Sequence, residues 1–81
     1  MKPEVRVDGT AVTVRGPRPA VERIADRLLA GDYPYRVEGG LYGERGAEIR
    51  VRFEAEAAAA WCAGIAGDEL FGSELGPPDV E

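Results

Sequence analysis

Residues 4–15 read EVRVDGTAVTVR, and this stretch decides how the fold begins. Apolar and polar side chains alternate on both sides of Gly9-Thr10, which is the pattern of two half-buried strands. A glycine in the first of two loop positions suits a type II′ turn, because glycine tolerates the positive φ required there. This turn sets valines opposite valines on one face and Glu4 opposite Arg15 on the other. We therefore expect a β-hairpin with one apolar face and one charged face.

A helix is predicted after this hairpin, with prolines at positions 17 and 19 near its start and Gly31 just past its end. Proline is favoured in the first turn of a helix and glycine directly after the last. Apolar side chains at spacings of three and four form a single stripe between these signals. The stripe consists of Val21, Ile24, Ala25, Leu28 and Leu29. We expect it to lie on the sheet.

A second hairpin is predicted over residues 35–54, and its turn at Gly43–Gly46 can close in two ways. A two-residue turn on Glu44-Arg45 mixes polar and apolar side chains on both faces. A three-residue turn, with Gly46 in the left-handed conformation, separates them and is the one we predict. The glycines at 39 and 40 leave space on each face or mark a second bulge. The predicted pairs are Leu41–Ile49 and Val37–Phe53 on the inner face, and Glu38–Arg52 and Arg36–Glu54 on the outer face.

A second helix is predicted from about Ala55 to Ala66, with one apolar side made by Ala58, Trp61, Cys62 and Ile65. The resulting element order is ββαββα. We expect an α+β fold, a two-layer sandwich in which a four-stranded antiparallel sheet carries both helices on one face. The other face is then open to solvent, as antiparallel sheets permit.

Charge divides the chain into two parts. Residues 1–66 hold all 10 basic groups and ten of the 15 acidic ones, and the net charge of −5 belongs to residues 67–81. We expect residues 1–66 to form a compact α+β domain, followed by an acidic C-terminal segment, 67–81, that is partly flexible.

The composition argues against several classes of site. One cysteine and no histidine leave no internal disulfide and no zinc ligand set, and Cys62 has no histidine to activate it. The sequence offers neither a strand-to-helix phosphate loop nor a separate carboxylate pair for acid–base chemistry. The weakly apolar run at 57–66 is half of what a membrane span needs, and no signal-peptide pattern precedes the first strand. We expect no enzyme activity, cofactor, metal or membrane partner, and a cytoplasmic protein.

The candidate binding residues lie in the acidic segment, where carboxylates alternate with apolar side chains. Such a mixture suits a protein partner with a basic surface, because the acids complement its charge and an apolar side chain can fill a pocket. The candidates are Asp68, Glu69, Leu70, Phe71, Glu74 and Leu75. In the alternative interpretation, Leu70 and Phe71 fold back and cap the small core.

These features predict a non-enzymatic protein-binding module, a small inhibitor or adaptor that occupies a basic, nucleic-acid-binding surface of its partner and has no small-molecule substrate. In size and charge the chain is similar to small acidic inhibitors carried by phages and mobile elements, including anti-CRISPR proteins. One alternative is direct nucleic-acid binding by the arginines of the open face. Interleaved acids, and Tyr42 as the one aromatic expected there, count against it. Another is an assembly subunit whose exposed sheet edge pairs with a second copy or a neighbour.

Overall fold

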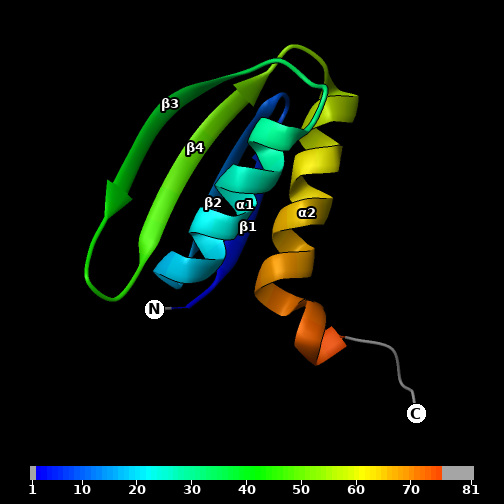
Figure 1. Cartoon of the computed structure of the whole chain (residues 1–81). Coiled ribbons are helices and arrows are strands. Elements are labelled where there is room, and N and C mark those ends of the chain that lie inside the picture. Colours follow the sequence, from blue (N-terminus) through cyan, green and yellow to red (C-terminus); the bar gives the residue numbers. More distant parts are fainter. Residues whose placement is uncertain (1, 76–81) are drawn as a thin grey trace.

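The computed structural model describes residues 2–75, with side chains through Phe71, and has two layers: a four-stranded sheet and two helices on one of its faces (Figure 1). Its elements are β1 (Glu4–Asp8), β2 (Ala11–Gly16), α1 (Arg18–Ala30), β3 (Tyr35–Tyr42), β4 (Ala47–Phe53) and α2 (Glu56–Leu75). The strands are antiparallel in the order β1-β2-β4-β3. The predicted α+β fold and its ββαββα order are confirmed.

The first hairpin has the predicted register. Val7 lies opposite Val12, and Glu4 lies opposite Arg15 with their charged groups 3.8 Å apart. Gly9 has a φ of 63°, the positive value that the first position of a type II′ turn requires. Turn chemistry and side-chain alternation therefore agree. In the strand order of the sheet, β1 is one edge.

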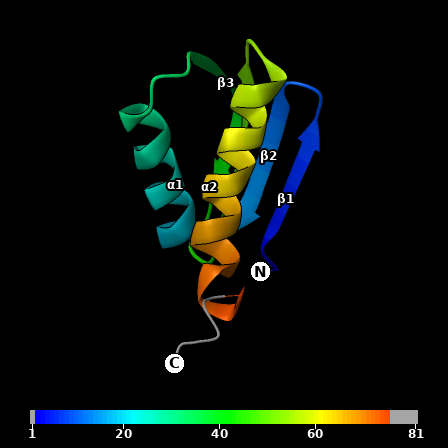
Figure 2. The same ribbon diagram turned by 90° about the vertical axis from the view of Figure 1, so that its right-hand side faces the viewer.

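The core lies between the helices and the inner face of the central strands β2 and β4. Helix α1 begins after Pro17 and ends at Gly31, as predicted, and α1 and α2 lie side by side across the sheet (Figure 2). The larger buried side chains are Val12, Val14, Val21, Ile24, Leu28, Ile49, Val51, Phe53, Cys62 and Ile65. One member of the predicted α1 stripe is wrong: Leu29 is 74% exposed. Helix α1 packs on β2, β4 and α2. Arg27 pairs with α2, and Leu29, two residues later, lies about 200° around the helix from it and so on the side away from α2.

The second hairpin corrects the predicted register. Gly43 donates its N–H to the carbonyl oxygen of Gly46 at 2.8 Å, which closes a two-residue turn, and Gly46 does not adopt a positive φ. Leu41 consequently lies opposite Glu48, on the open face. A bulge between Val37 and Gly39 then shifts the register by one residue. The bulge returns Val37 to the inner face, opposite Val51.

This shift also changes the predicted outer pairs. Arg36 lies opposite Arg52 and not Glu54, so that prediction is wrong. The predicted Glu38–Arg52 ion pair does form, at 2.7 Å, because Glu38 is the extra residue of the bulge and its carboxylate reaches Arg52. The glycine pair at 39–40 therefore marks a bulge, one of the two roles expected of it.

Helix α2 is longer than predicted. It continues past Ala66 to Leu75, although Gly67 and the acids after it suggested a stop. The extra turns are stabilised by tertiary contacts, since Asp68 and Glu69 pair with arginines of α1 and Leu70 packs against the core. Residues 76–81 of the predicted flexible segment lie outside the described residues. Within residues 2–75, neither helix combines the length and apolar character that a membrane span needs.

Candidate protein-interaction surface

Two acids of the predicted site are held against α1. Arg23 donates from Nε to Oε1 of Glu69 at 2.9 Å, and Arg27 donates from Nη1 to Oε2 of Glu69 at 3.0 Å. Arg27 also donates to Oδ2 of Asp68 at 3.1 Å. These hydrogen bonds, first from Arg23 and then from Arg27, lower the pKa of Glu69. The bonds to Asp68 and Glu69 likewise raise the pKa of Arg27. The acids thus join the C-terminal turns of α2 to α1.

Two apolar members of the predicted site, Leu70 and Phe71, are half-buried. Leu70 packs against the core at Gly16, where an added Cβ would lie 2.6 Å from Cδ2 of Leu70. Phe71 is half-buried in the next position of α2. Glu74 and Leu75 belong to the last turn of α2, and their side chains lie outside the described residues. The structure therefore gathers Asp68, Glu69 and Leu70 into contacts within the chain, and Asp68, with 67% of its side chain exposed, keeps the most contact with solvent.

A different surface collects the exposed apolar side chains. Six large hydrophobic residues of the described chain are exposed, and five of them lie on β3 or beside it: Leu29, Tyr33, Val37, Leu41 and Tyr42. We call these five residues the β3 margin. Leu41 is 74% exposed and Val37 61% exposed. Exposed apolar side chains gathered along one strand are typical of contact surfaces.

The β3 margin arises from the position and shape of β3. The strand is the edge of the sheet beyond β4, and in Figure 1 it curves away from α1 toward its turn. Val37 and Tyr42 point to the helix side, opposite Val51 and Ala47, whereas Leu41 points to the open face. Proteins usually blunt an exposed edge strand with lysine, proline or charges. Over its eight residues β3 has no proline and no lysine. Its charged residues are Arg36 and Glu38, and it presents apolar groups on both faces.

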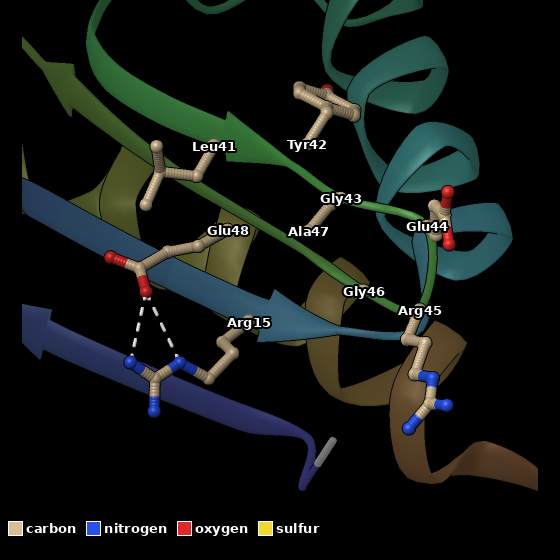
Figure 3. Close-up of a pocket in the computed structure, with 9 residues that line it drawn as sticks. All are labelled: Arg15, Leu41, Tyr42, Gly43, Glu44, Arg45, Gly46, Ala47 and Glu48. Carbon is tan, nitrogen blue, oxygen red and sulfur yellow. Dashed lines mark hydrogen bonds and ion pairs between the residues drawn. The ribbon is translucent and has the colours of Figure 1, made fainter.

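A shallow hollow continues the β3 margin around the turn. It is lined by Leu41, Tyr42, the turn at Gly43–Gly46 and the first residues of β4, with the ion pair between Arg15 and Glu48 at one side (Figure 3). In Figure 3 the side chains of Leu41 and Tyr42 leave the strand in different directions, and Tyr42 lies beside α1. The guanidinium of Arg18 lies 5.5 Å from the centre of the Tyr42 ring.

The open face of the sheet is a lattice of ion pairs. Arg15 lies between Glu48, at 3.1 Å, and Glu4, which also pairs with Arg6 at 2.9 Å. Arg52 pairs with Glu38, and this bond lowers the pKa of Glu38 and raises that of Arg52. Tyr42, the aromatic residue predicted for this face, lies on the helix side instead. Arg6, Arg15 and Arg52 of this face are paired with acids, and within residues 2–71 no aromatic side chain was found to stack on it. This favours a solvated surface over a nucleic-acid site.

Two observations concern catalysis and metal binding. Cys62 is fully buried, as predicted for a small core residue, and burial raises the pKa of its thiol to about 11. Among the described residues there is no group of three or more side chains placed to hold a metal ion. No protein-family model, curated protein or solved structure matches this chain. Its function is therefore interpreted from its own surface.

The sequence carried one faint signal of the β3 margin. Leu41 and Val37 are four residues apart, so uninterrupted alternation places both on the same inner face. The glycines at 39 and 40 are the only local sign that the alternation changes phase between them. Leu29 gave no such signal, because it fits the helical stripe and is exposed only through the placement of α1.

Proposed function

We propose that this chain is a non-enzymatic protein-binding module, an inhibitor or adaptor that acts by contact and uses the β3 margin as its contact surface. The observation that supports this proposal most strongly is an edge strand with exposed apolar side chains on both of its faces. A strand added to this edge gains backbone hydrogen bonds, and the flanking side chains supply specificity.

The side chains around the free edge suit such an addition. A strand laid beside β3 meets Val37 and Tyr42 on the helix side and Leu41 on the open side. Leu29 and Tyr33 stand next to the strand and extend the apolar contact toward α1. Aromatic and aliphatic groups of this kind are typical anchors at the centre of protein interfaces.

The charge of the chain bears on the kind of partner. A net charge of −5 favours encounter with a basic protein surface, including one that normally binds nucleic acid. Part of this charge is already neutralised within the chain, where Asp68 and Glu69 pair with Arg23 and Arg27. A role in the style of the small acidic inhibitors of phages and mobile elements, anti-CRISPR proteins among them, is consistent with this size and charge.

The experiment is a capture assay with immobilised full-length chain, offered both a cell lysate and a labelled copy of itself. Leu41→Lys places a charge in the β3 margin without touching the core, because Leu41 is largely exposed. Ala60→Lys, at an exposed position of α2, is the matched control. We expect the wild type and Ala60→Lys to retain the same protein, and Leu41→Lys to lose it. Equal retention by all three, or retention of nothing, would rule out the β3 margin as the contact surface.

A further inference from the structure

We infer that the occupant of the β3 margin is a second copy of this chain, with the two β3 strands paired antiparallel about a twofold axis between Glu38 and Gly39. This inference rests on the proposed function and names its partner. The pairing joins two sheets into one of eight strands, in the order β1-β2-β4-β3-β3-β4-β2-β1. In Figure 1, β3 lies at the outer margin of the sheet, with β4 on its other side.

The first argument comes from the faces of β3. Its pairing with β4 puts Tyr35, Val37, Gly40 and Tyr42 on the helix side, opposite residues of the inner face. The order in which β3 residues point to the helix side or the open face is therefore the same from Tyr35 to Tyr42 as from Tyr42 to Tyr35. An antiparallel copy about the axis therefore brings Tyr35 opposite Tyr42, and Val37 opposite Gly40, with all of them on one face. On the open face the stem of Arg36 lies opposite Leu41.

The bulge is what makes the whole strand self-complementary. Tyr35 and Tyr42 are seven residues apart, so regular alternation would direct them to opposite faces. The extra residue at Glu38 shifts the alternation of side chains by one position, so both tyrosines point to the helix side. The same bulge moves Leu41 to the open face, where it can cover the aliphatic part of Arg36.

The second argument comes from the backbone. Phe53 donates its N–H to the carbonyl oxygen of Thr10, so the polar groups of Phe53 face β2. Because the backbone polar groups of successive strand residues point to opposite sides, the N–H and carbonyl groups of Arg52 face β3. The hydrogen bond between Gly43 and Gly46 fits this alternation, since Gly46 also bonds toward β3. It follows that the backbone groups of the helix-side residues of β3 face the free edge. These are the residues that the twofold pairing sets opposite one another.

The third argument compares the two edges of the sheet. Strand β1 has five residues, and its open-face side chains are Glu4, Arg6 and Asp8, which protect an edge by their charge. Val7 is its one exposed large hydrophobe and is 49% exposed. Strand β3 has eight residues, of which two are charged, Arg36 and Glu38, and Glu38 is paired with Arg52 of β4. It carries three of the exposed hydrophobes itself. Self-association is therefore expected at β3 and not at β1.

The mass of the full chain in solution tests this directly. We expect sedimentation or light scattering to give twice the 8.7 kDa chain mass at high micromolar concentration. Val37→Lys should return the protein to the mass of one chain. Val7→Lys, the same substitution at an exposed valine of the other edge, should leave the dimer intact. A wild type that stays at 8.7 kDa, or equal effects of the two variants, would overturn the inference.

Single cysteines test the position of the axis. Gly39 and Gly64 each have open space for a side chain and no positive φ, so both accept a cysteine. Across the proposed axis the two copies of residue 39 are diagonal neighbours, within the reach of a disulfide. We expect Gly39→Cys to give covalent dimers under mild oxidation and Gly64→Cys, on α2, to give no covalent dimer, with the native Cys62 buried in both. Equal cross-linking would contradict the register.

The two proposals fail in different ways. A monomeric chain that still captures another protein, and loses it with Leu41→Lys, would overturn the dimer and support the β3 margin as a contact surface. A monomeric chain that captures nothing would overturn both. A dimer that Val37→Lys dissociates supports both.

Discussion

At the scale of single residues, the contact between Gly31 and Trp61 shows how the loop after α1 is held. Gly31 follows α1, and an added Cβ would clash with the Trp61 indole, lying 2.6 Å from its Cζ2. The indole cannot retreat freely. It packs against Tyr33, with ring centres 4.9 Å apart, and meets Phe53 edge-on. Glycine is therefore needed here because the Trp61 indole lies against the backbone of residue 31. This contact holds the start of the loop from α1 to β3.

We expect Gly31→Ala to destabilise the fold by about 1–3 kcal/mol, because the indole must shift within a packed cluster. Gly64→Ala is the matched control. This position lies in the exposed middle of α2 with open space around it, and alanine there should stabilise the helix by about 0.5–1 kcal/mol. Urea unfolding of the two variants measures both effects. Equal stability of Gly31→Ala and the wild type would show that Trp61 does not constrain this loop.

At the scale of elements, the two hairpins show what local sequence can and cannot predict. Gly9-Thr10 and the alternating valines specify one turn and one register, and both were predicted correctly. For the second hairpin, the prediction assumed one register from the turn to the strand ends, because that register separated apolar from charged side chains on the two faces. The chain instead combines a tight turn with a bulge at Glu38, so two registers share one strand. The assumption of a single register along the strand therefore placed Leu41 on the wrong face.

The end of α2 was mispredicted for a different reason. Gly67 and the following acids have poor helix signals when read locally, and the ion pairs that hold them involve Arg23 and Arg27, more than forty residues earlier in the chain. A local pattern contains no information about such partners. The candidate residues Asp68 and Glu69 were therefore identified as charged and exposed, while their joint contact with α1 became visible only in the structure.

This contact predicts a pH-dependent contribution to stability. The pKa of Glu69 is lowered in the folded chain, so its ion pairs stabilise the fold above the ordinary carboxyl range and the contribution is lost as pH falls through the lowered pKa. We expect Glu69→Gln to cost about 0.5–1 kcal/mol at neutral pH, with the difference from wild type vanishing in acid. Glu22→Gln, which removes the exposed Arg18 pair within α1, should cost less. Chemical unfolding across pH measures both, and a constant difference for Glu69→Gln would contradict this assignment.

At the scale of the whole molecule, the exposed apolar surface follows from how far the helices cover the sheet. The two layers and the ββαββα order of the elements were predictable, because hairpin and helix patterns are local. The coverage was not predictable, because it depends on where α1 rests on β2 and β4. That placement leaves Leu29, Val37 and Tyr42 exposed along one edge. The β3 margin is thus a product of packing between distant elements, and we regard it as the surface through which the protein acts.

Residue-resolved hydrogen exchange of the full chain, compared between its monomeric and assembled states, tests this claim most directly. The assembled state is the dimer or, if another protein is captured, that complex. We expect the amides of Val37, Gly40 and Tyr42 to become protected on assembly, because their N–H groups face the free edge, while the exposed amides of β1 exchange at the same rate in both states. Unchanged exchange along β3, or protection that appears on β1 instead, would contradict the central role of the β3 margin.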